Sequence, residues 1–112
     1  MSKQEELVQS YFSKIRNRDL EGLLSFFAAP AVLKLPDGRE FSGVAAIREM
    51  YRGLFAALAP SPTPVAIIVG TDAMATEIEA RLPDGTIRRT ANFFHLDQEG
   101  RIQRLNIYAR GG

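Results

Sequence analysis

Side chains that could serve as a nucleophile or a metal ligand are scarce in this sequence. Its 112 residues include no cysteine and a single histidine. The absence of cysteine excludes a thiol nucleophile, a thiolate-bound zinc and a disulfide framework. His95 is expected on the face of its predicted strand that points away from the pocket. We therefore expect it at a surface or an interface rather than in catalysis. We predict no metal site and no cofactor.

Three polar side chains are expected to point inward, and all three are neutral. Tyr11 shares a helical stripe with Leu7 and Ile15, and Tyr51 lies on a second such stripe. Asn92 alternates in phase with apolar residues along a predicted strand, so its amide needs hydrogen bonds. Structural hydrogen bonds would explain all three residues without a ligand. An amide N–H can also donate to an oxyanion, so a role in binding or catalysis stays open.

A general base is harder to identify. Asp37 lies in a Pro-Asp-Gly turn that recurs around Asp84, which favours a role in the turn itself. Glu40, in the same region of the chain, is the better candidate base. Glu77 and Glu79 alternate away from the apolar face of their strand, and we expect them at a solvated or interface surface.

The apolar spacing predicts helices in the first half of the chain. One helical stripe runs from Glu5 to Asn17. Asp19 is predicted to cap a second, short helix that ends at Pro30. Ser42 is predicted to cap a third helix that continues to about Leu58. A short hairpin with a Pro-Asp-Gly turn is expected between the second and third helices.

The hydrophobic period changes from 3.6 to 2 after the third helix. The segment Pro60–Pro64 contains three prolines and is predicted to be a stiff connector outside regular structure. Turn residues then separate four predicted strands, at 65–69, 74–82, 87–96 and 101–109. Helices followed by antiparallel strands indicate the α+β class, with the helices covering one face of the sheet.

Composition limits the partners of this chain. Fourteen Lys and Arg residues against thirteen Asp and Glu residues leave a net charge of +1, with no basic block. We therefore expect no binding to nucleic acid or to an anionic membrane surface. No apolar run approaches the roughly 20 residues that span a bilayer, and the first residues are polar and charged. These features predict a cytoplasmic protein.

Several local strings occur in an order and spacing typical of one superfamily. They are Val8-Gln9-Ser10-Tyr11, Arg18–Leu23 with Phe27-Ala28, Ser42-Gly43 with Ala46–Glu49, and Phe94–Asp97 with Gly100–Ile102. The chain thereby resembles the NTF2-like superfamily and, within it, the SnoaL-like and ketosteroid isomerase-like proteins. The resemblance extends from Leu7 to Ala109, and we expect one such domain over residues 1–112. It implies an α+β cone (a cystatin-like roll), whose N-terminal helices pack on a curved, mostly antiparallel sheet around an apolar pocket.

The resemblance also implies site residues. In ketosteroid isomerases a tyrosine and a protonated aspartate hydrogen-bond the dienolate oxygen, and a second aspartate moves the proton. Tyr11 matches the oxyanion tyrosine, Tyr51 a supporting tyrosine, and Asn92 the oxyanion aspartate. Leu35 takes the place of the base aspartate and cannot accept a proton. The expected pocket wall consists of Leu33, Leu35, Met74, Ile78, Phe94, Leu105 and Ile107.

Two functions are compatible with these features. The first is an isomerase, cyclase or dehydratase acting on a small apolar molecule with a carbonyl or phenol oxygen, with Glu40, water or the substrate as the base. The second is a non-catalytic module for ligand binding or dimerisation. Phe93, Ile102 and Tyr108 are expected on the outer face of the sheet, which predicts a homodimer through that face.

Overall fold

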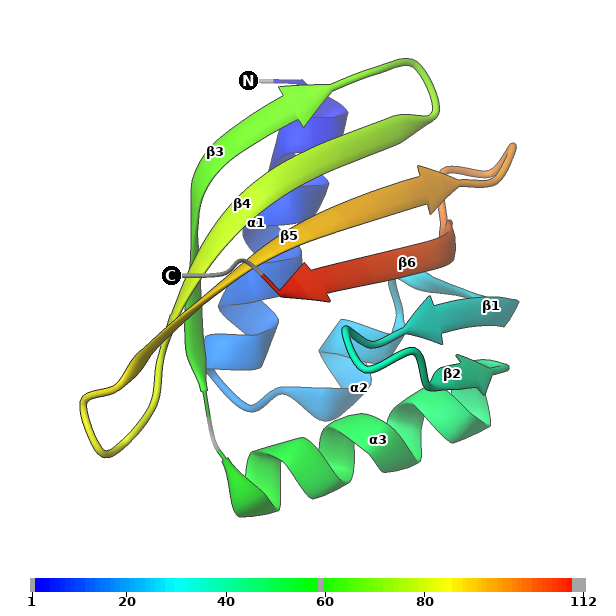
Figure 1. Ribbon diagram of the computed structural model, residues 1–112. Coiled ribbons are helices and arrows are strands. Elements are labelled where there is room, and N and C mark those ends of the chain that lie inside the picture. The colour runs from blue at the N-terminus through cyan, green and yellow to red at the C-terminus, as the bar shows by residue number, and fades with distance from the viewer. Residues whose placement is uncertain (1, 59, 110–112) are drawn as a thin grey trace.

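The computed structural model describes residues 2–58 and 60–109, which form helices and strands in the order that Figure 1 shows. The elements are α1 (Lys3–Arg16), α2 (Leu20–Leu24), β1 (Phe27–Lys34), β2 (Glu40–Ser42), α3 (Val44–Ala57), β3 (Ser61–Val69), β4 (Ala73–Arg81), β5 (Ile87–Leu96) and β6 (Ile102–Ala109). Within these residues no helix has the length and apolar character needed to cross a membrane.

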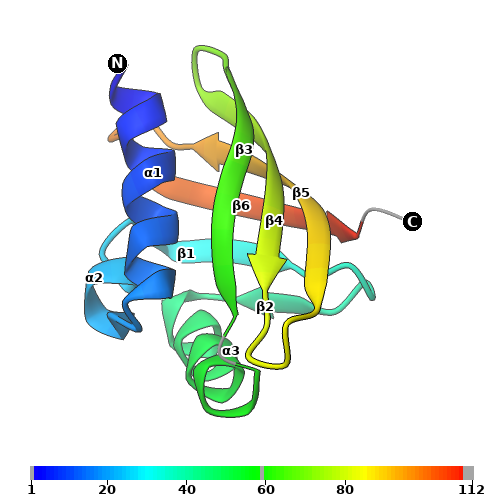
Figure 2. The same cartoon turned by 90° about the vertical axis from the view of Figure 1, so that its left-hand side faces the viewer.

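The six strands form one curved sheet in the order β2-β1-β6-β5-β4-β3. All neighbouring strands are antiparallel except β1 and β6, which pair in parallel. Helix α1 lies on the inner side of the sheet beside β3, and α3 packs against β1 and β2 (Figures 1 and 2). The α+β class and the curved sheet around N-terminal helices are therefore as the sequence predicts.

Two helix boundaries differ from the sequence prediction. The carboxylate of Asp19 does cap α2, because its Oδ1 accepts a hydrogen bond from the backbone N–H of Gly22 at 3.0 Å. However, α2 ends at Leu24, and Pro30 lies inside β1, where the register with β6 is interrupted. A strand tolerates proline at such an irregularity, because a ladder hydrogen bond is already missing there.

Helix α3 begins one residue later than predicted. Ser42 is the last residue of β2, and Gly43 occupies the N-cap position without a side-chain hydrogen bond. The backbone of Gly43 has a φ of 88°, in the left-handed region where glycine carries no Cβ penalty. The sharp change of direction from strand to helix therefore requires a glycine rather than a serine cap.

The proline-rich segment is a strand, so the prediction of an irregular connector is wrong. Strand β3 begins at Ser61, with Pro62 opposite Ala80 and Pro64 opposite Ile78 of β4. Because β3 is an edge strand, half of its backbone N–H groups have no ladder partner to satisfy, and proline can occupy those positions. The register also shifts directly after Pro64.

Ile102 was expected on the outer face of the sheet, but it is fully buried in the core. The alternation of β6 is interrupted because the register between β5 and β6 shifts between His95 and Leu96. After this bulge both Ile102 and Leu105 point inward, although they are three residues apart. A strict period of two places Ile102 on the wrong face.

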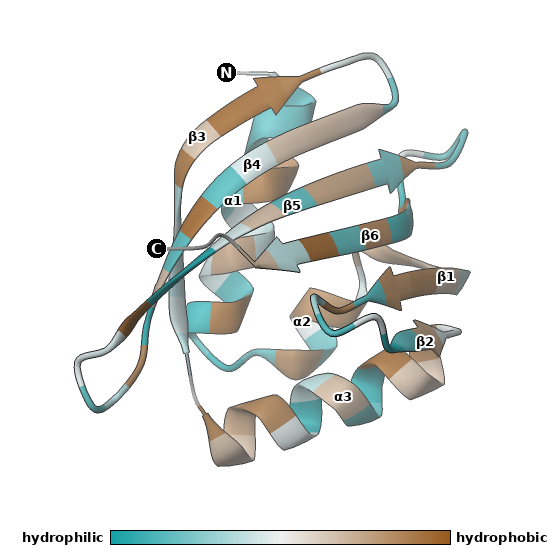
Figure 3. Cartoon of the chain, viewed as in Figure 1, coloured by the Kyte–Doolittle hydropathy of each residue, from teal (hydrophilic) through white to brown (hydrophobic). Residues whose placement is uncertain are grey.

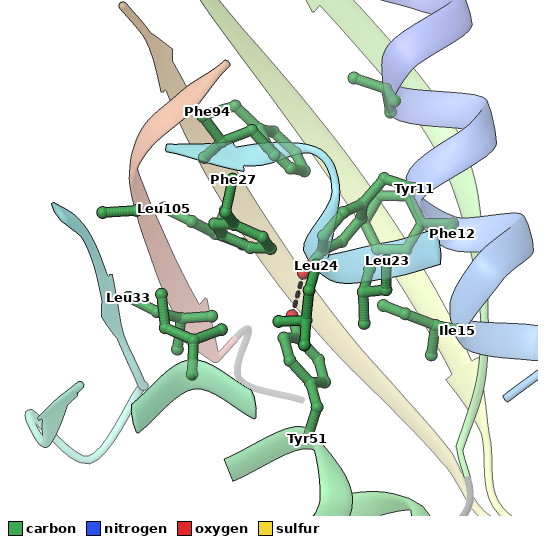
Figure 4. Packing of buried hydrophobic residues seen from close by; sticks show 14 of the residues in the cluster. Tyr11, Phe12, Ile15, Leu23, Leu24, Phe27, Leu33, Tyr51, Phe94 and Leu105 are labelled. Carbon is green, nitrogen blue, oxygen red and sulfur yellow. Dashed lines mark hydrogen bonds between the residues drawn. The ribbon is translucent and has the colours of Figure 1, made fainter. Parts of the chain in front are cut away.

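The core lies between α1 and the inner face of the sheet (Figure 4). The ring of Tyr11 meets the rings of Phe12 and Phe94 edge to face, at centroid distances of 4.9 and 5.2 Å. Leu33 and Leu105 are opposite each other on the parallel strands β1 and β6, and both are fully buried. Aromatic rings in this arrangement fill the narrow part of the cone.

Candidate functional site

A cavity of about 380 Å³ lies between the helices and the inner face of the sheet. Its walls come from α1, α3, β4, β5 and β6, and its mouth is bordered by the β1–β2 turn, the segment before β3 and the base of the β4–β5 hairpin. Figure 1 shows this hairpin extending past the C-terminal end of α3. Most of the wall is apolar, and the polar groups on it are few.

The hydroxyl groups of Tyr11 and Tyr51 form a hydrogen bond with each other (Figure 4). Tyr11 is 0% exposed and Tyr51 is 3% exposed, and both line the cavity. Burial raises the pKa of Tyr11 well above its ordinary value, and the neighbouring Tyr51 adds to this shift. Burial likewise raises the pKa of Tyr51, although its bond with Tyr11 opposes the shift. Both phenols are therefore neutral at physiological pH.

The tyrosine pair retains a proton for a ligand. Two hydroxyl groups carry two protons, and the single hydrogen bond between them uses only one. Because Tyr11 is 0% exposed and Tyr51 is 3% exposed, the remaining proton reaches an oxygen atom in the cavity when Tyr51 accepts from Tyr11 and donates its own proton to the ligand. A donor of this kind costs no reorganisation at the moment of reaction, because the surrounding core already holds both rings.

Asn92 supplies a second donor to the same cavity. Its side chain is 4% exposed, and its Oδ1 accepts a hydrogen bond from Thr90 Oγ1 at 3.0 Å. The amide Nδ2 has no hydrogen-bond partner among residues 2–58 and 60–109. Every fully enclosed side-chain nitrogen or oxygen in those ranges does have a partner, so Nδ2 must reach the cavity surface. The Thr90 bond thus orients the N–H groups toward the cavity.

The structure places no free carboxylate inside the cavity, as far as the described residues define it. Asp37 is at the mouth, where its Oδ2 pairs with Arg39 Nε at 2.8 Å. Hydrogen bonds and charge from Arg39 hold the pKa of Asp37 below its usual value, the backbone N–H contributing most. Glu40, the candidate base from the sequence, instead accepts from Arg104 Nη2 at 3.1 Å and lies outside the cavity wall.

The predicted wall residues divide into two groups. Leu35, Ile78 and Ile107 line the cavity beside Tyr11, Tyr51 and Asn92. The other four are absent from the described wall and lie in the packed core: Leu33, Met74, Phe94 and Leu105. The rings of Tyr11 and Phe12 pack against Phe94, and all four residues belong to the buried core cluster rather than to the cavity wall.

Sequence reasoning missed several wall residues. Phe12 and Ile15 follow Tyr11 on the inner stripe of α1, Arg39 comes from the β1–β2 turn, and Arg88 comes from the start of β5. A signal for Arg88 was present, because it alternates in phase with Asn92 along β5. Its side chain is exposed at the cavity mouth.

A larger hollow of about 580 Å³ lies elsewhere, near the β5–β6 turn. It is an open surface feature lined by polar side chains, including Asp72, Asp97 and Glu99. No group of three or more potential metal ligands occurs in the described part of the chain. A neighbouring hollow of about 440 Å³ shares Leu35, Tyr51 and Ile107 with the smaller cavity but contains neither Tyr11 nor Asn92. We assign the candidate site to the smaller cavity, because all three buried hydrogen-bond donors meet an apolar wall there.

Comparison with known proteins places these features in context. The SnoaL-like domain family matches residues 8–105. A polyketide cyclase candidate from Sinorhizobium meliloti, protein SMa1630, is 25% identical, with 91% of this chain and 93% of that chain covered and a TM-score of 0.82. A ketosteroid isomerase candidate from Kribbella flavida is 16% identical, with 96% and 77% covered and a TM-score of 0.85. A computationally designed 17-OHP binder is 20% identical, with 92% and 87% covered and a TM-score of 0.80. No curated protein matches this sequence.

Proposed function

The chain belongs to the SnoaL-like domain family of the NTF2-like superfamily, and from this premise we propose that its cavity binds a small, mostly apolar molecule through one carbonyl or phenol oxygen. The observation that carries the proposal is a tyrosine pair and an amide nitrogen on one otherwise apolar wall. The volume of about 380 Å³ is near the lower end of the roughly 300–1,000 Å³ usual for small-molecule sites.

The proposed chemistry is isomerisation or cyclisation through an enolate-like intermediate. Neutral donors stabilise the negative charge that develops on the substrate oxygen, and each can contribute several kcal/mol, about 3–4 for a well-placed one. Tyr11, supported by Tyr51, and Asn92 would supply these donors. The similarity to a polyketide cyclase candidate supports a reaction of this class. Because Leu35 stands where the base is expected, a water molecule or the substrate itself would carry the proton.

A second candidate function is ligand binding without turnover. The carboxylate on the described wall, Asp37, is already paired with Arg39, and its pKa is lowered. Asp37 is therefore a weak general base, which favours binding without turnover. A fold neighbour that is a designed 17-OHP binder supports the idea that this scaffold can hold a ligand. Turnover of a bound ketone distinguishes the two functions.

The donor proposal can be tested with 2-naphthol and naphthalene, which differ by one hydroxyl group. We expect 2-naphthol to bind more tightly by about 0.5–1.5 kcal/mol, the usual net contribution of a neutral hydrogen bond. Tyr11→Phe and Asn92→Leu should remove most of this difference. Tyr108→Phe is the matched control, because Tyr108 is 51% exposed and lies outside the cavity wall. Equal affinities for the two compounds in the unmodified protein would contradict the proposal.

We also propose a homodimer through the outer face of the sheet. Phe93 and Tyr108 are exposed there and pack edge to face, with ring centroids 5.6 Å apart. Ile68 is 71% exposed near the end of β3, which Figure 3 shows as a strongly hydrophobic stretch. Adjacent exposed apolar groups on neighbouring strands are typical of an interface. Sedimentation should show a dimer at micromolar concentration that Phe93→Asp disrupts, and a monomeric unmodified protein would contradict this proposal.

A further inference from the structure

One inner row of β5 connects the closed end of the cavity with its mouth. Arg88, Thr90 and Asn92 alternate along the strand, and all three line the cavity. Successive residues on one face of a strand are about 6.7 Å apart, so the Cα atoms of Arg88 and Asn92 are separated by ~13 Å. The row therefore carries an amide donor at its inner end and a guanidinium group at its outer end.

The guanidinium group of Arg88 is available to a ligand. It forms no hydrogen bond and no ion pair within the described ranges. Asp84 is close enough to interact with it through space, but the carboxylate of Asp84 accepts a hydrogen bond from the backbone N–H of Thr86 at 2.8 Å. The acid on the cavity wall, Asp37, is neutralised by Arg39.

The next residue along the strand, Arg89, is also an arginine, but it lies on the other face and has an ionic partner. Arg89 points to the outer face, where its Nε is 3.3 Å from Glu79 Oε2 on β4. Its charge is compensated by a neighbour on the same surface. Arg88 is exposed too, but it stands on the cavity side of the strand and has no acidic partner within hydrogen-bond distance among the described residues.

We propose that the ligand of this cavity carries a carboxylate at the end opposite its carbonyl or phenol oxygen, and that Arg88 binds this carboxylate at the mouth. The inference rests on the proposed function, because the donors of Tyr11 and Asn92 define the other end of the ligand. A guanidinium group can donate two parallel hydrogen bonds to a carboxylate, which fixes the direction in which the molecule enters. Arg39 and Asp37 form an ion pair at the same mouth and together add no net charge, so the guanidinium of Arg88 is the uncompensated charge on the described wall.

The test compares three probes that share one aromatic body: 6-hydroxy-2-naphthoate, its methyl ester and 2-naphthol. In the unmodified protein the carboxylate should bind about tenfold more tightly than the ester, a modest factor because the pair is partly solvated. Arg88→Gln should remove this advantage and leave the affinities for the ester and for 2-naphthol within about twofold. Arg89→Gln is the matched control, with the same loss of charge on the outer face, and should change none of the three affinities.

The outcomes separate this inference from the proposed function. If Asn92→Leu weakens 2-naphthol while Arg88→Gln leaves the affinity for the carboxylate unchanged, the ligand-binding function stands and the carboxylate inference is overturned. An equal loss for Arg88→Gln and Arg89→Gln also overturns it, because the effect then reflects net charge alone. If none of the three probes binds the unmodified protein, both the function and the inference are overturned.

Discussion

The substitution Leu35→Asp tests whether the cavity retains the donor half of an isomerase site. Leu35 follows β1, lines the cavity and is only partly buried. Its backbone N–H donates to the carbonyl of Arg39 at 2.9 Å, and this bond does not depend on the side chain. An aspartate at this position should therefore keep the turn and place a carboxylate on the wall shared with Tyr11, Tyr51 and Asn92.

The magnitudes follow from the position of Leu35. Full truncation of a core leucine costs 2–5 kcal/mol, so a partly buried position should lose less, about 1–3 kcal/mol with the cost of the polar group included. Desolvation would raise the pKa of the new carboxyl, while Arg39 at the mouth would oppose that shift. A positioned general base contributes about 10²–10⁴-fold to a rate, and we expect a gain within that range.

The assay is the isomerisation of a β,γ-unsaturated 3-ketosteroid, followed by the absorbance of the conjugated product. The unmodified protein should show negligible turnover, and Leu35→Asp a measurable rate. Leu35→Asn is the matched control, since it has the same shape but cannot accept a proton. Rapid isomerisation by the unmodified protein would refute the vacant-base reasoning. A folded Leu35→Asp variant that binds the steroid but remains inert would show that the donors are misplaced.

Three further predictions concern stability. Burial raises the pKa of Tyr11 and Tyr51 in the folded chain, so unfolding should release protons above pH ~10, and stability should fall by about 1.4 kcal/mol per pH unit for each tyrosine. The free energy of unfolding can be measured with urea between about pH 9 and pH 12, a range that includes the ordinary tyrosine pKa of about 10. It should fall less steeply with pH in the Tyr11→Phe, Tyr51→Phe double variant than in the unmodified protein. Phe94→Ala should cost about 3–5 kcal/mol in urea unfolding, because Phe94 is 0% exposed against two aromatic rings. Asp19→Ala should cost about 1 kcal/mol by loss of the α2 cap, whereas an unchanged midpoint would exclude that role.

The sequence predicts the order of elements well, because periodicity and turn residues are local signals. Strand β5 has the predicted bounds, and Asp19 caps α2 as its residue type suggests. Errors occurred where tertiary context decides. Pro62 can join a strand only because β3 is at the edge of the sheet, and Ile102 is buried because of a bulge between β5 and β6.

The neutral hydrogen-bond donors of the candidate site were predictable, but its arginines and much of its apolar wall were not. Tyr11 and Asn92 were identified by the faces of their elements, and both line the cavity. Phe94 shares the inner face with Asn92, yet aromatic rings from α1 cover it. How far a helix fills the space inside a curved sheet depends on packing between segments that are distant in the sequence. A local sequence pattern therefore cannot predict which inward-facing residues line a cavity and which are covered.

The parallel pairing of β1 with β6 has a kinetic consequence. These two strands are far apart in the sequence, yet they are neighbours inside the sheet, and their pairing joins the β1–β2 hairpin to the other four strands. The sheet cannot be completed until the last strand is available, so contacts of high sequence separation must form late in folding. During synthesis, the chain would expose the apolar faces of β1 and of the β3–β5 meander until β6 leaves the ribosome. Such a nascent chain is a natural client for chaperones.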